Sequence, residues 1–358
     1  YQDMNALHLD WQSQYVYFYR DQDELAGDDK AYGSRLRHQP KISLPLRKNW
    51  GFVEPSFTLD HTDYSLQSYS PEDNHLSRTV PIYEIDSGLY FDKPSSFINK
   101  DLRLSLEPRL YYAYSKAKDQ DDIPNFDSAL PSFYYDRLFS PNRFSGGDRI
   151  GDNNRLTLGF TSRWTDKYSG VDRAIFSLGQ IYHYDDRTVN LNGEGQSTRS
   201  DSLLASELTL KPNANIELSM TGLWNSKSNT TQEGNSSANF HSKDYSTVLN
   251  FSHRYIRDEL EQSDTSIILP LYKSLSLIGR WRYDLDSNST IGTLAGVEYG
   301  SCCWRVQFLT QSYLSDDSEI LNGVLFRFQL KGVGGFGQST RRMDEHIPGY
   351  EAREALFN

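Results

Sequence analysis

The feature that most constrains the fold is a strict alternation of apolar and polar residues, which recurs along nearly the whole chain. The first such segment places large apolar side chains on one face of an extended chain and Gln12 and Gln14 on the other. The apolar set is Leu7, Leu9, Trp11, Tyr15, Tyr17 and Tyr19. A repeat of two residues is the period of a β-strand with one apolar face. The chain is therefore predicted to be all-β and antiparallel.

The alternation directly predicts fifteen strands. They cover residues 6–19, 35–46, 50–62, 79–92, 101–114, 154–166, 171–184, 201–211, 214–225, 243–255, 260–270, 274–284, 290–301, 304–313 and 322–331. Bacterial membrane barrels alternate long external loops with short periplasmic turns. Counted back from a periplasmic C-terminal end, the connection 226–241 would be a long link on the short-turn side. We therefore expect a sixteenth strand in the polar stretch 232–241, which has Phe240 as its one large apolar residue.

With sixteen strands, every long connection falls on the predicted external side and the short ones fall on the periplasmic side. The long connections are 20–34, 63–78, 115–153, 185–200 and 314–321, and the short ones include 47–49, 167–170 and 211–214. Because the extra strand was inferred from one connection only, the agreement of the others supports a two-sided arrangement.

The composition agrees with a membrane barrel. The chain has 24 Tyr and 18 Phe against three Met, and its aromatic residues gather at the ends of the strands, as in the interfacial girdles of such barrels. No window approaches the roughly 18 uninterrupted apolar residues of a membrane-spanning helix, and the mean hydropathy is −0.67. A transmembrane strand needs only about ten residues, half of them polar, so low hydropathy does not exclude a barrel.

Nucleic-acid binding and catalysis both lack support in the sequence. The net charge of −11 opposes binding to phosphate backbones. The eight His show no HExxH or repeated metal spacing, and no GxSxG elbow, Walker loop or GxGxxG motif is present. Asp119, Asp121 and Asp122 in the acidic segment 119–127 are weak candidates for a divalent cation, although a solvated loop is the favoured interpretation. We expect no enzymatic activity and no cofactor.

Cys302 and Cys303 are adjacent, which makes a disulfide between them strained. The predicted topology puts them in a periplasmic turn, where disulfides form and persist. We expect pairing with cysteines outside this chain, and two free thiols are the alternative. The chain begins at Tyr1 without a leader, so it is expected to be a mature product or part of a longer protein.

Three stretches of the chain resemble the family of the LPS-assembly protein LptD. The first runs from Leu106-Glu-Pro-Arg-Leu-Tyr-Tyr112 through the segment 119–130 and Tyr135-Asp-Arg-Leu-Phe139 to Arg143-Phe-Ser-Gly-Gly-Asp-Arg-Ile150 and Thr161-Ser-Arg163. The second is Val297-Glu-Tyr-Gly-Ser-Cys-Cys-Trp304, and the third is Phe328-Gln-Leu-Lys-Gly-Val333 with Ile347-Pro-Gly-Tyr350 near the end. The resemblance extends over nearly the whole chain.

The resemblance implies a barrel of about 26 strands that inserts lipopolysaccharide into the outer leaflet of the Gram-negative outer membrane. In that family the lipoprotein LptE sits inside the barrel, and a jelly-roll domain receives lipopolysaccharide from the bridge protein LptA. Residues 1–331 would then be the C-terminal barrel strands and 332–358 a periplasmic tail, while the jelly roll and the first strands would lie outside this chain.

The resemblance also assigns roles to residues. Cys302 and Cys303 would each pair with a cysteine of the N-terminal region, and the strand 322–331 would form one wall of a lateral gate. The gate residues would be Asn322, Val324, Phe326, Phe328 and Leu330. A further hypothesis is that the chain is an assembly substrate whose last strand is held by BamA of the BAM complex. A passive porin, a TonB-type transporter and a smaller barrel enzyme are the alternatives.

Overall fold

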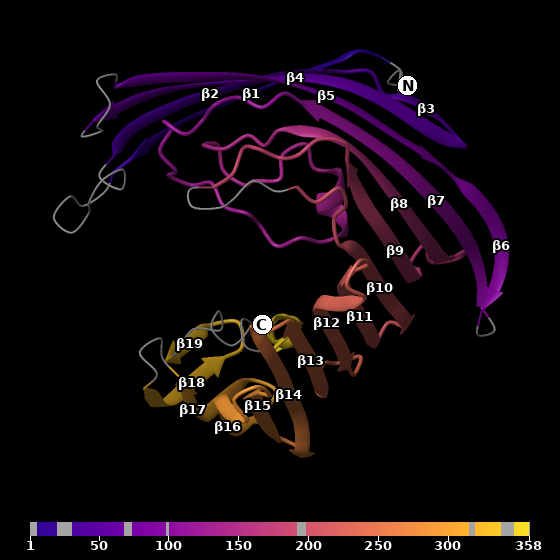
Figure 1. Ribbon diagram of the computed structural model, residues 1–358. Helices are drawn as coiled ribbons and strands as arrows, with labels where there is room; N and C mark the ends of the chain where they lie inside the picture. Colours follow the sequence, from indigo (N-terminus) through magenta and orange to yellow (C-terminus); the bar gives the residue numbers. More distant parts are fainter. Residues whose placement is uncertain are drawn as a thin grey trace. The chain divides into compact units, whose positions relative to one another are not determined.

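The computed structural model describes residues 6–19, 31–67, 74–97, 100–191, 198–314, 319–337 and 347–357. Within these ranges the chain forms one antiparallel sheet of nineteen strands, with a 3₁₀ helix and one short α-helix (Figure 1). The predicted all-β class is therefore confirmed. None of the helices in these ranges has the length and apolar character needed to cross a membrane.

The chain divides into two compact units, the first made of residues 1–163 and 177–206 and the second of residues 164–176 and 207–358. The first unit contains β1 (His8–Phe18), β2 (Tyr32–Ser43), β3 (Leu46–Lys48), β4 (Gly51–Gln67), β5 (His75–Leu89), β6 (Phe91–Phe97), β7 (Lys100–Ser115), η2 (Tyr135–Phe139) and most of β8 (Asn153–Asp166) and β9 (Asp172–His183). Neighbouring strands in this unit pair antiparallel, as in the full-length match of β1 to β2 from His8 opposite Ser43 to Phe18 opposite Gly33.

Two predicted strands are each divided in two. The predicted strand 35–46 becomes β2 and β3, which both pair with β4, and the interruption falls at Leu44 and Pro45. Proline has no N–H for the ladder, so a break at this point is expected. The predicted strand 79–92 becomes β5 and β6, which both pair with β7. The two strands are separated by Tyr90, whose N–H donates to the carbonyl oxygen of Trp50 at 2.8 Å.

The second unit contains most of β10 (Leu204–Asn213), and then β11 (Ile216–Asn225), β12 (Thr230–His241), β13 (Val248–Ile256), β14 (Leu260–Tyr272), β15 (Leu275–Asp284), β16 (Ser289–Gly300), β17 (Trp304–Leu314), β18 (Ile320–Leu330), β19 (Gly334–Gly337) and the helix α2 (Tyr350–Phe357). The sixteenth strand inferred from connection length is confirmed, because β12 pairs along its length with β11 and β13. The described residues of the predicted tail 332–358 include two further elements. Its residues add β19 to β18 and form α2.

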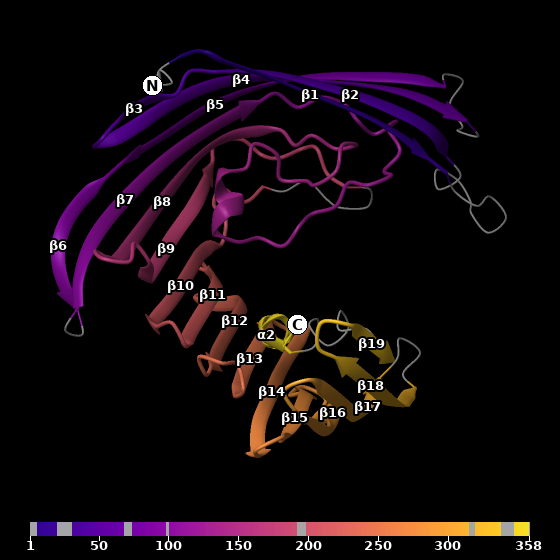
Figure 2. The same ribbon diagram turned by 180° about the vertical axis from the view of Figure 1, so that it is seen from behind.

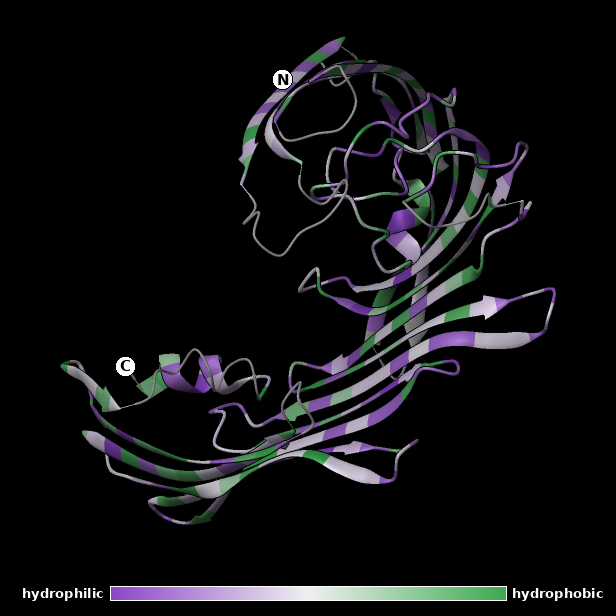
Figure 3. Cartoon of the chain, turned by 60° about the vertical axis from the view of Figure 1, so that its left-hand side comes forward, coloured by the Kyte–Doolittle hydropathy of each residue, from purple (hydrophilic) through white to green (hydrophobic). Residues whose placement is uncertain are grey.

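The two faces of the second unit differ in the way that the alternation predicts. One face buries Val248, Ile268, Ile278, Leu294 and Leu309 beneath Ile347 and Tyr350 of the tail. The other face exposes large apolar side chains: Leu249, Phe251, Trp281, Val297, Phe308, Val324 and Phe326. Bands of opposite hydropathy alternate along these strands (Figure 3). An apolar face left open to the surroundings is what a strand facing lipid requires.

In the first unit, the long connection between β7 and β8 does not project away from the sheet. It runs back over one face of β2, β4, β5 and β7, carrying η2 with it, and both views of the ribbon show this placement (Figures 1 and 2). Ile123 packs with Tyr64 and Leu66, and Ile150 packs with Val80 and Ile82. The length of this connection was predicted, whereas its packing against the sheet was not.

Candidate functional site

The connection between β7 and β8, residues 116–152, is fastened to the sheet by two buried arginines, Arg35 and Arg78. Arg35 of β2 is 1% exposed and reaches two carboxylates of the connection. Its Nη1 donates to Asp127 Oδ1 and to Asp148 Oδ1, both at 2.7 Å, and its Nη2 donates to Asp127 Oδ2 at 2.7 Å. Because a guanidinium has several donors in a fixed fork, one side chain can bind both carboxylates.

Asp148 is satisfied from several directions at once. The Tyr64 hydroxyl donates to its Oδ1 at 3.0 Å, and the backbone N–H groups of Phe126 and Asp127 donate to its Oδ2 at 2.8 Å each. Buried charges are tolerated when they are paired and hydrogen-bonded in this manner. Asp148 thus ties two parts of the connection to each other, and Arg35 ties both parts to the sheet.

The second arginine, Arg78 of β5, binds the same connection near Asp148. Arg78 Nη1 donates to Gln120 Oε1 at 2.8 Å and to the carbonyl oxygen of Asp148 at 2.6 Å, and Nη2 donates to the carbonyl oxygen of Gly147 at 2.9 Å. A Cβ on Gly147 would lie 2.8 Å from Arg35 Cζ. Glycine at this position therefore lets the backbone approach the two arginines.

The electrostatics of Asp127 follow from these contacts. Burial by itself would raise its pKa, but the hydrogen bonds from Arg35 and from the Gly147 N–H outweigh burial and lower the pKa to about 2. The carboxylate stays ionised at neutral pH and keeps the ion pair with Arg35.

The acidic residues singled out from the sequence do not gather into a site. Asp119, Asp121 and Asp122 are exposed, and Asp119 accepts the N–H of Asp121 at 3.1 Å in a local turn. The described ranges contain no group of three or more His, Cys, Asp or Glu side chains placed to hold a metal ion. These three carboxylates are exposed, whereas Gln120 and Ile123 of the same segment are buried, so the segment is only partly a solvated loop.

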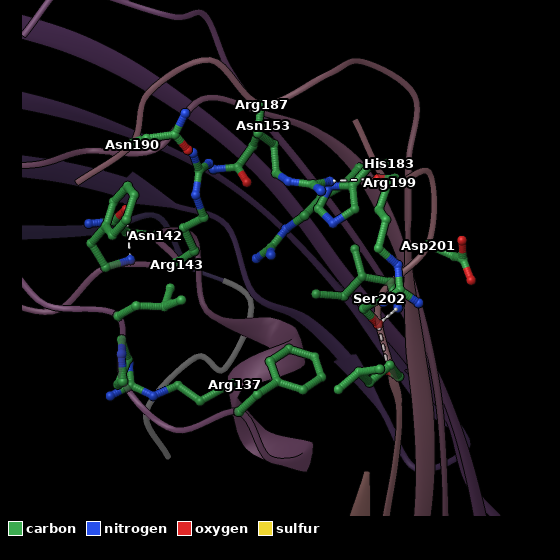
Figure 4. Close-up of a pocket in the computed structure, with 17 residues that line it drawn as sticks. Arg137, Asn142, Arg143, Asn153, His183, Arg187, Asn190, Arg199, Asp201 and Ser202 are labelled. Carbon is green, nitrogen blue, oxygen red and sulfur yellow. Dashed lines mark hydrogen bonds between the residues drawn. The ribbon is translucent and has the colours of Figure 1, made fainter. Parts of the chain in front are cut away.

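A pocket of about 550 Å³ lies in the first unit between the segment 130–144, the strands β8 and β9, and residues 187–190 and 199–203. Five arginines line it, whereas Asp201 is the single carboxylate among its described lining residues; the arginines are Arg137, Arg143, Arg155, Arg187 and Arg199. Arg143, Arg187 and Arg199 gather with His183 at one end, and Arg137 lies at the other (Figure 4). No sequence motif indicates this group, because its members come from separate segments.

Backbone oxygens accept hydrogen bonds from three of the pocket arginines. Arg143 Nη2 donates to the Val189 carbonyl, Arg155 Nη2 to the Ser140 carbonyl, and Arg187 Nη1 to the Arg199 carbonyl at 2.9 Å. Such contacts orient a guanidinium and leave its positive charge in place. The arrangement is suited to binding anions rather than to acid–base catalysis.

The two cysteines lie in the turn between β16 and β17, and both thiols are exposed and free in this chain. They form no disulfide with each other. The neighbouring Cys302 thiol raises the pKa of Cys303. The turn is held by the Lys331 N–H, which donates to the carbonyl oxygen of Cys303 at 3.0 Å. Both thiols are accessible to a partner cysteine.

The five predicted gate residues share one face of β18. Their partners on β17 are, in order from Asn322 to Leu330, Ser312, Thr310, Phe308, Val306 and Trp304. Val324 is 61% exposed and Phe326 is 47% exposed, so this face is open. The prediction that β18 ends the sheet needs correction, since β19 pairs with Arg327 to Leu330 on its far side. Glycines at Gly334, Gly335 and Gly337 permit this short extra strand.

The helix α2 is fastened to the inner face of the second unit by ion pairs. Arg353 Nη2 lies 2.6 Å from Glu298 Oε1, and Arg327 Nη1 lies 2.9 Å from Glu354 Oε2. Arg305 also pairs with Glu354. The sequence analysis predicted only a tail here, although the alternating charges of Glu351 to Glu354 after an apolar Ile347 were a usable signal for a docked helix.

Comparison with known proteins supplies a family. Residues 1–313 match the family model of LptD, described as LPS transport system D. The chain is 47% identical over 350 residues to the LPS-assembly protein LptD of Marinobacter nauticus, covering 97% of this chain and 44% of that protein. It is 45% identical over 343 residues to that of Hahella chejuensis, covering 94% and 43%. The chain thus spans less than half the length of these curated relatives, and neither is named as an enzyme.

Solved structures give only a distant likeness. A ferric enterobactin receptor mutant from Pseudomonas aeruginosa has a TM-score of 0.33 at 7% identity, over 83% of this chain and 54% of that one. The FpvAI–pyocin S2 complex has a TM-score of 0.30 at 10% identity, over 90% and 54%. TM-scores at this level do not indicate a shared function.

Proposed function

The chain belongs to the LptD family, and from this premise we propose that it is part of a β-barrel that transports lipopolysaccharide and inserts it into the outer leaflet. The chain is located in the outer membrane of a Gram-negative bacterium. In the proposed role the protein transfers a lipid without making or breaking covalent bonds, so that no catalytic group is required.

The observation that carries the proposal is the difference between the two faces of the sheet. A glycolipid with a charged head and several acyl chains needs a polar path for the head and contact with hydrocarbon for the chains. The outward side chains of β13, β16 and β18 are apolar and exposed, as at Phe251, Val297 and Val324. The opposite face of the same strands carries polar groups such as Asn250, Glu298 and Arg327.

We further propose that β18 is one wall of a lateral gate. Its apolar residues Val324, Phe326, Phe328 and Leu330 would face the acyl chains as they leave the barrel. In the described ranges, the backbone pairing of its far side is limited to Arg327–Leu330 with β19, and residues 320–326 have no strand partner there. A seam with few ladder hydrogen bonds opens at low cost compared with a fully paired one.

The partners of the whole protein are part of the same proposal. LptE would occupy the barrel interior, and LptA would deliver lipopolysaccharide to a jelly-roll domain that is joined to this chain. Cys302 and Cys303, exposed in their turn, would form disulfides with cysteines of that N-terminal region. During assembly, β18 would pair with a strand of BamA, for which its incompletely paired side is available. A structure of the chain with the BAM machinery would test this last point.

The test of the function is carried out in cells with the full-length protein. Non-reducing gels and surface lipopolysaccharide are compared between the wild type, the double variant Cys302→Ser with Cys303→Ser, and the control Ser301→Ala in the same turn. We expect the double variant to lose a disulfide-dependent mobility shift and to reduce surface lipopolysaccharide, while the control keeps both. Unchanged mobility and unchanged lipopolysaccharide in the double variant would contradict the proposal.

A further inference from the structure

We propose that the arginine-lined pocket of the first unit binds a phosphorylated sugar. This ligand class rests on the proposed function, because the head of lipopolysaccharide carries such groups. The pocket is formed entirely within one compact unit, from described residues of the segment 130–144, from residues 153–155 of β8 and 181–183 of β9, and from residues 187–190 and 199–203. It needs no placement of one unit against the other.

The charge of the pocket is the first argument. Asp152, the acidic partner of Arg143 at 3.2 Å, is already bound by the N–H and the hydroxyl of Thr188 at 2.7 and 3.0 Å. These hydrogen bonds and Arg143 lower the pKa of Asp152 against the effect of burial, so it counts as one negative charge. Asp201 is the one carboxylate among the described lining residues, and the charges of Asp152 and Asp186 act on Arg187 from outside the lining. The described lining therefore has an excess of positive charge that an anion would neutralise.

Arg137 and Arg155 have no close counter-ion among the described residues. Across the described ranges, neither Arg137 nor Arg155 has a carboxylate partner in an ion pair, and the Nε of each is buried without a hydrogen bond. Arg155 is only 3% exposed. The charge of Glu84 acts on Arg155, but its Oε1 accepts from Tyr111 at 2.8 Å. A buried guanidinium without a close counter-ion is costly, and a bound anion would remove that cost.

The remaining lining indicates that more than a bare ion is bound. Asn142, Asn153, Asn190 and Ser202 offer amide and hydroxyl groups that suit sugar hydroxyls. Apolar side chains cover the rest of the wall: Leu130, Pro131, Phe133, Phe144, Ile181 and Leu203. The volume of about 550 Å³ is within the usual range of small-molecule pockets, about 300 to 1,000 Å³. Arginine forks match the oxygens of a phosphate group and would fix its orientation.

The position of the pocket agrees with a ligand on the outer side of the membrane. Its lining includes Arg137 and Arg143, and also Arg187 and Arg199. These residues come from the connections 115–153 and 185–200, which the sequence predicts to be extracellular. A sugar phosphate that reaches the outer leaflet would meet this edge of the barrel. Binding there would favour forward movement of the lipid head once the acyl chains have left the lumen.

Binding is tested with the full-length protein purified in detergent, titrated with glucosamine 1-phosphate, glucosamine or inorganic phosphate. We expect glucosamine 1-phosphate to bind at least about tenfold more tightly than inorganic phosphate, and glucosamine without phosphate not to bind. Absence of binding by the sugar phosphate would overturn the proposal. Equal affinity for inorganic phosphate would overturn it as well, since the pocket would then be a simple ion site.

The variants locate the binding. Arg137→Gln and Arg199→Gln should each weaken binding of glucosamine 1-phosphate about tenfold. Arg163→Gln is the matched control, because Arg163 is on the same strand as Arg155 but pairs with Glu107 at 3.3 Å outside the pocket. Equal loss in the control, or no loss in the pocket variants, would refute the location.

A second measurement on the wild-type protein does not depend on how the variants fold. The arginine reagent phenylglyoxal should modify Arg137 more slowly when glucosamine 1-phosphate is present, and modification of the exposed Arg47 should not change. An unchanged rate at Arg137 would overturn the proposal. Because these assays measure binding and not transport, failure of the pocket leaves the cellular test of the proposed function untouched. Conversely, failure of that cellular test leaves a measured binding site in place.

Discussion

Replacing Arg35 with methionine tests whether this buried side chain keeps the connection 116–152 packed against the sheet. The change removes the partner of Asp148, which is 0% exposed, and of Asp127, whose side chain is 36% exposed. Removing one partner of a buried ion pair costs about 3 to 5 kcal/mol. Water can solvate Asp127, and Asp148 keeps the hydrogen bonds from Tyr64 and two N–H groups, so we expect the lower end, about 3 kcal/mol.

Hydrogen exchange of the full-length protein measures this loss directly. The amides of Phe126, Asp127 and Gly147 donate to side chains inside the network, so they exchange when the connection opens. A loss of about 3 kcal/mol corresponds to exchange about a hundredfold faster. The control Arg47→Met removes an exposed ion pair with Glu54 and should change the free energy of opening by less than about 1 kcal/mol.

Two results of the exchange measurement would refute this role of Arg35. If Arg35→Met leaves the exchange of these amides unchanged, the apolar packing of Ile123 and Ile150 holds the connection without the ion pairs. If Arg35→Met and Arg47→Met accelerate exchange equally, the effect is a general one of lost charge. An intermediate effect of Arg35→Lys is expected, since an ammonium group lacks the fork that reaches both carboxylates.

Three further predictions concern the same network and the helix α2. The pKa of Asp127 lies at about 2, below its ordinary value of 3.8. Its pairing with Arg35 therefore stabilises the closed connection above about pH 4, and this stabilisation is lost as the pH falls toward 2. Hydrogen exchange, corrected for its intrinsic pH dependence, should show that the connection opens between about pH 4 and pH 2 and not at higher pH. Gly147→Ala should open the connection, because the new Cβ would lie 2.8 Å from Arg35 Cζ. The control Gly234→Ala should not open it, because the nearest atom to its new Cβ lies at 4.0 Å. Equal exchange rates in the two variants would contradict the steric argument. Tyr350→Ala should release α2 at a cost of about 3 to 5 kcal/mol, seen as faster proteolysis within the helix, and an unchanged cleavage rate would show that the ion pairs alone suffice.

Local patterns in the sequence were sufficient for most of the strands and for the face of the sheet on which their apolar residues lie. Alternation has a period of two and is set by the backbone, so Phe251 and Val324 could be assigned to the exposed face before any pairing was known. Even β12, whose composition is too polar to be seen directly, followed from the length of one connection. Interruptions such as Tyr90 were missed, because they depend on a hydrogen bond to another strand.

Tertiary structure alone decided what lies against the inner face of the strands. Arg35 and Asp127 are 92 positions apart, and the pocket arginines come from separate segments, so no local pattern could indicate that they meet. The same holds for α2, whose Glu354 reaches Arg327 only after the sheet has formed. The physical reason is that alternation specifies which way a side chain points, whereas the partner it finds there depends on how distant segments fold back upon the sheet.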